Sequence, residues 1–158
     1  MVKKNIILGK YCWYDGSNYE GEWCENTLNG WGIYNFKDGR KYSGQWKMNT
    51  MHGYGEYSWN DGRRYIGFYN MDKKEGFGIY IWNESRAYIG YWKDGKQHGV
   101  GKYINNGTVR YAFWQKGKRI NWYQDENEAI QNIPNNTTDN FNKLFLYELK
   151  DIFAYFSS

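Results

Sequence analysis

The feature that most constrains this chain of 158 residues is a repeat with a period of 23 residues. Each unit opens with a tyrosine, a glycine two residues later and an aromatic residue two further on. The first such segment is Tyr19-Glu20-Gly21-Glu22-Trp23, and the pattern returns from Tyr42, Tyr65 and Tyr88 without an insertion. A pattern kept in register in this way predicts one small structural unit that is stacked several times.

The second half of each unit carries a Gly-x-Gly element and then an Asp-Gly pair, as in Gly30-Trp31-Gly32 and Asp38-Gly39. Both halves alternate with period two, which predicts two strands per unit, and Asp-Gly predicts the hairpin between them. If the marked residues share one sheet face, the loop must hold an odd number of residues. We therefore expect a three-residue loop, Lys37-Asp38-Gly39, with Tyr34 opposite Tyr42 on a face that we call face A.

This pattern of Tyr-x-Gly-x-Trp, Gly-x-Gly and Asp-Gly resembles the MORN (membrane occupation and recognition nexus) repeat, from residue 9 to about residue 114. The array fades after Tyr111, where Phe113 and Gln115 replace the expected glycine and tryptophan. The expected fold is all-β: an elongated single antiparallel sheet of tandem 23-residue β-hairpins over residues 6–115. A polar linker at 116–137 and a C-terminal amphipathic α-helix at 138–156 are expected to follow.

Composition agrees with a sheet whose core is built from rings and glycines, since aromatic residues make up 22% of the chain. A net charge of +4 does not by itself indicate a nucleic-acid partner, and none is expected. No apolar stretch approaches the ~20 residues that span a bilayer, so we expect a cytoplasmic protein. Cys12 and Cys24 do not face each other in the expected register and are predicted to be free thiols.

The face opposite face A, which we call face B, is mixed in the first two units and apolar in the next two. Ile66, Phe68, Ile79 and Ile89 are examples of the apolar part, and such a patch is rarely left in water. The expected C-terminal helix has its own apolar side. It is either a lid over face B or a docking element for a partner. Its apolar residues are Phe141, Leu144, Phe145, Leu149, Ile152, Phe153 and Phe156.

Nothing in the sequence has the pattern of a catalytic site, so we expect no enzyme, no cofactor and no metal. His52 and His98 occupy equivalent places two periods apart and have no carboxylate cluster beside them, which makes a poor zinc site. The Gly-x-Gly elements lie inside strands and do not open a helix, so they do not form a phosphate loop. Glu20 and Glu22 share a face, as many exposed strand carboxylates do.

Basic residues follow the Asp-Gly loops and would line one edge of the sheet. They are either a solvated edge that discourages strand pairing or a contact for a polyanion such as an acidic lipid headgroup. The candidates are Arg40, Lys41, Arg63, Arg64, Arg86 and Arg110.

The resemblance implies a non-enzymatic scaffold that binds protein partners within a large cytoskeletal or ciliary (axonemal) assembly. A sheet face lined with rings suits a helix or peptide laid across it, with tryptophan and tyrosine as anchors. The expected partner-binding residues are Trp23, Tyr42, Trp46, Tyr65, Tyr69, Tyr88 and Trp92.

Two other functions stay open at this point. The first is a peripheral membrane module that uses the basic edge to bind acidic phospholipids, with weak contact only. The second is an accessory subunit of a larger enzyme complex, in which a separate polypeptide would carry the catalytic domain.

Overall fold

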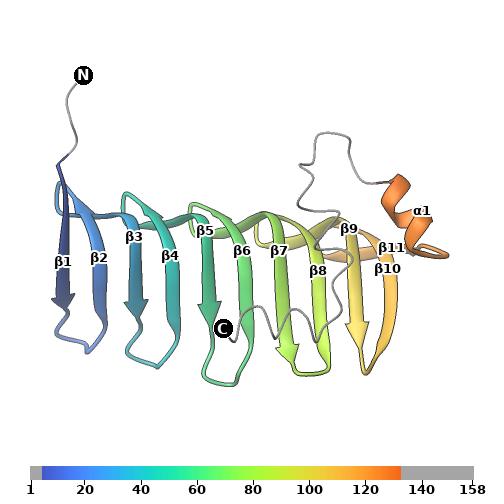
Figure 1. Cartoon of the computed structure of the whole chain (residues 1–158), viewed down its shortest axis with the longest axis horizontal. Coiled ribbons are helices and arrows are strands. Elements are labelled where there is room, and N and C mark those ends of the chain that lie inside the picture. Colours follow the sequence, from blue (N-terminus) through green and yellow to red (C-terminus); the bar gives the residue numbers. More distant parts are fainter. Residues whose placement is uncertain (1–4, 133–158) are drawn as a thin grey trace. The chain divides into compact units, whose positions relative to one another are not determined.

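The computed structural model describes residues 5–132, which form antiparallel strands and one short helix (Figure 1). The chain divides into two compact units, residues 1–74 and 75–158. The first unit holds β1 (Ile6–Cys12), β2 (Asn18–Cys24), β3 (Thr27–Asn35), β4 (Lys41–Lys47), β5 (Thr50–Ser58) and β6 (Arg64–Asn70). The second holds most of β7 (Lys73–Asn83), with β8 (Arg86–Lys93), β9 (Lys96–Asn105), β10 (Thr108–Gln115), β11 (Lys118–Trp122) and α1 (Glu126–Gln131).

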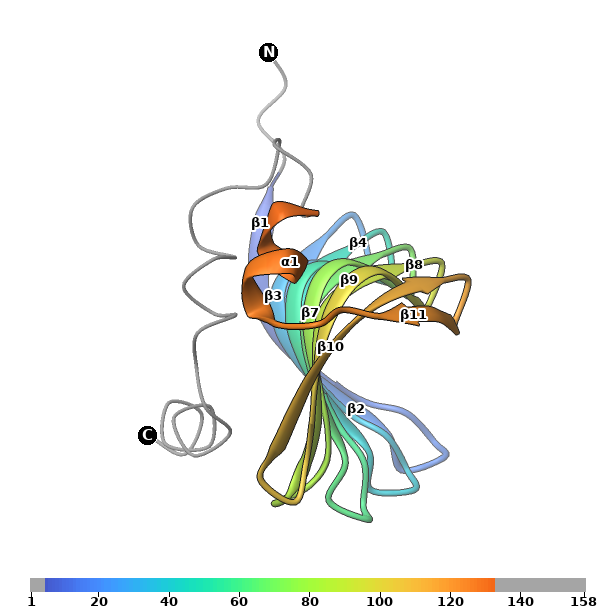
Figure 2. The same ribbon diagram turned by 90° about the vertical axis from the view of Figure 1, so that its right-hand side faces the viewer.

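Within each unit every strand pairs antiparallel with its neighbours in the sequence, and the strands are twisted, as antiparallel ribbons are (Figure 2). The predicted fold class, tandem hairpins in an antiparallel sheet, is confirmed. The predicted register is confirmed as well: Tyr34 lies opposite Tyr42, Gly32 opposite Gly44 and Gly30 opposite Trp46.

The Asp-Gly loop is closed as the parity of face A requires. The Phe36 N–H donates to the Arg40 carbonyl, and the Gly39 N–H donates back to the Phe36 carbonyl, both at 2.9 Å. Gly39 has a φ of 88°, a conformation that glycine adopts without steric cost. Lys37, Asp38 and Gly39 therefore form the three-residue loop that the sequence predicts.

The second turn of each repeat was not foreseen. It holds two residues with positive φ, for example Met48 (48°) and Asn49 (65°), which is the geometry of a two-residue type I′ hairpin turn. The Asn49 N–H donates to the Leu28 carbonyl, and the Asn49 Oδ1 accepts from the Leu28 N–H at 2.8 Å. These two hydrogen bonds connect the turn to the hairpin before it. The Asp72 N–H likewise donates to the Met51 carbonyl, and the Asp72 Oδ1 accepts from the Met51 N–H.

Glycines lie opposite glycines in every neighbouring strand pair of the first unit: Gly9–Gly21, Gly21–Gly32, Gly32–Gly44, Gly44–Gly55 and Gly55–Gly67. The ring of Tyr19 fills the space above one such pair. A Cβ added to Gly32 would lie 2.1 Å from the Tyr19 hydroxyl, and one added to Gly21 would lie 2.7 Å from it. Tyr42 covers Gly44 and Gly55 in the same way.

The segment expected to be a polar linker contains regular structure over its first part. Lys118–Trp122 extends the sheet as β11, which pairs with β10, and Glu126–Gln131 forms α1. The Asp125 side chain caps α1 by accepting from the Glu128 N–H, and Ala129 packs against Val100 in a buried cluster. A helix that the sequence reading missed therefore covers part of face B in the second unit. The expected helix at 138–156 lies outside the described residues, and its role as a lid stays a prediction.

The two cysteines lie at opposite ends of the β1–β2 pair. Cys12 is opposite Asn18 and is exposed, while Cys24 is opposite Ile6 and is buried. The prediction that they do not face each other is confirmed, and both are free thiols.

Gly32→Ala should destabilise the protein by about 2–3 kcal/mol, because the new methyl group overlaps the Tyr19 ring and cannot be accommodated without moving it. Gly9 is the matched control, since it holds the same place in β1 but its Cβ would meet only Trp23, at 3.2 Å. Gly9→Ala should cost less than about 1 kcal/mol. Urea denaturation measures both values, and equal losses would contradict the packing of the ring on the glycine pair.

Candidate binding groove

The repeated tyrosines are structural. Tyr19, Tyr42 and Tyr65 in the first unit, and Tyr88 in the second, are each 0% exposed. Their hydroxyls donate to the carbonyl oxygens three residues ahead, at Glu22, Gln45, Phe68 and Tyr91, over 2.9–3.2 Å. A buried hydroxyl needs such an acceptor. These rings therefore have no surface left to offer a partner.

The repeated tryptophans are also held by their own sheet. The Trp46 Nε1–H donates to the Gly32 carbonyl at 3.2 Å, and Trp23 and Trp92 make the equivalent bonds to Gly9 and Gly78. Trp46, Trp92 and Tyr69, the tyrosine found at the tryptophan position, are at most 7% exposed. Only Trp23 is half-buried.

Six of the seven residues expected to bind a partner are thus core residues: Tyr42, Trp46, Tyr65, Tyr69, Tyr88 and Trp92. Sequence parity places them correctly on face A. It does not show that neighbouring rings bury one another there. Trp46, for example, packs edge-on against Tyr19 and Tyr42, with centroid distances of 5.6 and 5.0 Å.

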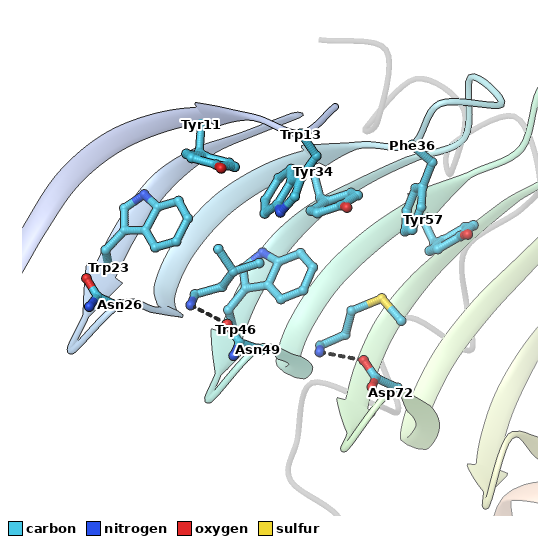
Figure 3. Close-up of a pocket in the computed structure, with 12 residues that line it drawn as sticks. Tyr11, Trp13, Trp23, Asn26, Tyr34, Phe36, Trp46, Asn49, Tyr57 and Asp72 are labelled. Carbon is cyan, nitrogen blue, oxygen red and sulfur yellow. Dashed lines mark hydrogen bonds between the residues drawn. The ribbon is translucent and has the colours of Figure 1, made fainter. Parts of the chain in front are cut away.

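A groove of about 870 Å³ lies on face A of the first unit, above these buried rings (Figure 3). Trp23, Trp46, Leu28 and Met51 form its floor, because Leu28 lies opposite Trp23 and Met51 opposite Trp46 on the strands. The other residues that line it are Tyr11, Trp13, Asn26, Tyr34, Phe36, Asn49, Tyr57 and Asp72.

One wall of the groove is a row of rings in mutual contact. The centroids of Trp13 and Tyr34 are 5.2 Å apart, those of Tyr34 and Phe36 are 4.7 Å apart, and those of Phe36 and Tyr57 are 5.6 Å apart. Trp13 and Phe36 are half-buried. Rings fixed by their neighbours lose little conformational entropy when a ligand contacts them, which favours their use as anchors.

The opposite wall is polar and is made from the two-residue turns. Asn26, Asn49 and Asp72 follow one another along the first unit (Figure 3). The Oδ1 atoms of Asn49 and Asp72 are held by the backbone N–H groups of Leu28 and Met51, at 2.8 Å each. Asp72 is the single charged residue among those that line the groove.

The basic residues at the loops are largely engaged with their own neighbours. Arg40 pairs with Asp38 and Arg63 with Asp61, both at 2.8 Å, and Arg64 pairs with Glu56 at 2.6 Å. Arg86 lies 4.4 Å from the Trp82 ring and Arg110 lies 3.6 Å from the Trp122 ring. Lys41 is exposed. The hydrogen bond from the Arg40 side chain is the main cause that lowers the pKa of Asp38.

The groove positions that the sequence reading missed do recur with the period. Trp13, Phe36 and Trp59 occupy one repeated place, and Leu28 and Met51 occupy another. These positions vary in residue type from unit to unit, so they give a weaker sequence signal than the repeated tyrosine. Among residues 5–132 no group of three or more His, Cys, Asp or Glu side chains could hold a metal ion. In the same range no helix is long and apolar enough to cross a bilayer.

The comparisons with known proteins agree with this architecture. A family model described as the MORN repeat matches three consecutive stretches, residues 42–63, 65–84 and 88–109. A search of curated proteins found no significant match. MORN repeats are non-catalytic modules that in general bind proteins or membrane lipids.

The buried tyrosines predict a loss of stability at high pH. Burial raises the pKa of Tyr19 to about 12, from an ordinary value of about 10, and it raises the pKa of Tyr42 and Tyr88 in the same direction. Because the folded state favours the neutral ring, the stabilisation is complete below pH 10 and is lost as the pH rises from 10 through 12. The free energy of unfolding, measured in urea, should fall over that range.

A Tyr19→Phe variant tests the assignment. It keeps the ring over Gly21 and Gly32 but has no proton to lose, so its stability should fall less steeply above pH 10 than that of the wild type. A slope identical to the wild-type slope would show that Tyr19 does not contribute.

Proposed function

Since the chain is a MORN-repeat protein, we propose that it is a non-enzymatic scaffold whose groove on face A of the first unit binds an apolar helix or peptide of a protein partner. The observation that carries the proposal is the groove itself. Its wall and floor include half-buried side chains, namely Trp13, Tyr34, Phe36, Trp23 and Met51, while the repeated tyrosines beneath them are fully used in the fold. An apolar, ring-lined concavity with few polar groups is the ordinary form of a binding site.

The repeat spacing favours a helical occupant. Equivalent residues of adjacent hairpins, such as Leu28 and Met51, are two strand spacings apart, or roughly 10 Å. A helix rises by about 10.5 Å in seven residues. A helix with an apolar residue at every seventh position would therefore place one side chain over each floor position. Asp72 at one end of the polar wall favours a lysine or arginine at the matching end of that helix.

The setting that we propose is a cytoskeletal or ciliary assembly. The support for it is the resemblance to the MORN family, several members of which belong to axonemal or cortical structures. The expression of a fluorescently tagged full chain in flagellated cells tests it directly. Diffuse fluorescence that washes out after detergent extraction would count against this setting.

Binding of acidic phospholipids is the second candidate, and three exposed cations favour it. Lys41, Arg86 and Arg110 have no carboxylate partner within the described residues, whereas Arg40, Arg63 and Arg64 are already paired with acids. About 1 kcal/mol per basic residue near an anionic surface gives three residues only weak attraction. Sedimentation with phosphatidylserine vesicles at physiological salt measures it.

The groove is tested by peptides selected from a random library on the wild-type chain. Phe36→Ser should weaken their binding by about 30-fold, or ~2 kcal/mol, as expected for an aromatic anchor. Phe68→Ser is the control, because Phe68 is an accessible ring on face B, 47% exposed, and it should change the affinity less than about threefold.

Asp72→Asn refines the test, since the amide oxygen can still accept from the Met51 N–H while the charge is lost. It should weaken selected peptides that carry a basic residue and leave uncharged ones unchanged. Peptides that bind equally to the wild type and to Phe36→Ser would refute the groove. Vesicle binding lost in an Arg86→Glu, Arg110→Glu variant would then favour the lipid function.

A further inference from the structure

In the first unit, the outer edge of β1 has no neighbouring strand among the described residues (Figure 1). Four of its seven residues are large apolar side chains that are more than half exposed: Ile6, Ile7, Leu8 and Tyr11. Natural edge strands are usually protected by charge, proline or a bulge. Here Lys10 is the one charged residue, and its ammonium group is 3.4 Å from the carboxylate of Glu20 on β2.

The register shows which backbone groups of β1 face outward. In β3 the Trp31 N–H points toward β2, where the Glu22 carboxylate accepts it. Leu8 occupies the place of Trp31 in β1, one period earlier, so its N–H and carbonyl point to the open edge. Because strand residues alternate, Ile6, Lys10 and Cys12 also face outward, and Gly9 faces β2.

β1 is also self-complementary. Gly9 is the central residue of Ile6–Cys12, and every neighbouring strand pair of the first unit places a glycine opposite a glycine. An antiparallel copy of β1 centred on Gly9 would continue this row. It would pair all seven residues, whereas a shift of two residues in either direction would pair five.

We propose that β1 pairs with β1 of a second copy of this chain, antiparallel and about a twofold axis that passes between the two Gly9 residues. Leu8 and Lys10 of the two copies exchange backbone hydrogen bonds, and Ile6 does so with Cys12. Ile7 lies opposite Tyr11 without such bonds. No like charges are opposed, because Lys10 faces Leu8. The contact is isologous, so it closes as a dimer and does not continue as a filament.

The pairing would place face A of both copies on the same side of the joined sheet, because the twofold axis is perpendicular to the sheet. Tyr11, which lines the groove at its β1 end, would then lie next to Ile7 of the second copy. The dimer would join two grooves end to end, and a longer helix could bind across both.

Cysteine cross-linking tests the register. In a Cys12→Ser background, Ile7→Cys chains are mixed with Tyr11→Cys chains and oxidised at low protein concentration. Residues in non-hydrogen-bonded pairs have Cα atoms about 4.5 Å apart, within reach of a disulfide. The mixture should give a 7–11 linked dimer, identified by mass spectrometry, in at least fivefold excess over either variant alone, since 7–7 and 11–11 contacts are four residues out of register.

Sedimentation equilibrium gives a second, independent measurement. Wild-type protein should be in a monomer–dimer equilibrium. Leu8→Pro removes one outward N–H and should raise the dimer dissociation constant at least tenfold, while Leu8→Thr keeps the N–H and should change it less than threefold. Far-UV circular dichroism of both variants checks the fold.

A strictly monomeric wild type would overturn the proposal. So would a 7–11 yield equal to that of the single variants, or a ladder of higher oligomers, which would indicate pairing of β1 with the other end of the sheet.

Discussion

The packing of a tyrosine ring on a pair of facing glycines is the interaction on which the rest of the structure depends. A Cβ at Gly32 would overlap the Tyr19 ring. One at Gly21 would overlap the backbone of Trp31 and Gly32 as well as the Tyr19 hydroxyl, so neither position can hold a side chain. The same packing recurs with Tyr42 and Tyr88. A sheet normally buries a face against a second layer. Here the first unit buries its large rings against its own backbone, which allows a core to form within a sheet of hairpins.

In this arrangement, the residues that stabilise the fold are largely different from those that we propose for partner binding. The tyrosine hydroxyls and the tryptophan Nε1–H groups are satisfied by backbone carbonyls of the same unit, so the invariant residues are fully used in holding the hairpins together. Trp13 and Phe36, by contrast, are half-buried and pack against Tyr34. The Arg40 guanidinium lies 4.9 Å from the Phe36 centroid. Tyr34 packs against the buried Trp46 with a centroid distance of 5.9 Å, so the buried rings support a second row of rings. We propose that row as the contact surface for a partner.

The sequence predicts the strands, the loop at Asp38-Gly39 and the pairing of Tyr34 with Tyr42, because a strict period and the parity of the marked residues leave one register. It does not predict which rings are covered, since that depends on how Trp46 packs between Tyr19 and Tyr42. The sequence does not predict the turn at Met48-Asn49, because neither residue is glycine although both adopt positive φ. The polar, Asn-rich composition after Gln115 predicts a linker, and so β11 and α1 are not predicted there. Asp125 and Glu128 nevertheless have the pattern of a helix N-cap.

The positions that vary from repeat to repeat determine what the groove can bind. The floor place held by Leu28 and Met51 is held next by Lys74, whose ammonium group lies 5.6 Å from the Trp59 centroid and 5.2 Å from the Tyr65 centroid. Burial is the main cause that lowers the pKa of Lys74. Lys74 is not among the residues that line the groove, so the apolar floor positions end at Met51 and Asp72 stays the single charged residue of the lining. The constant residues set the spacing of about 10 Å between hairpins. The variable ones set the chemistry of the groove: Leu28 and Met51 on the floor are apolar, and Asp72 places an acid on the polar wall. If the groove binds a helix as proposed, that helix must match both the spacing of the hairpins and the chemistry of these variable positions.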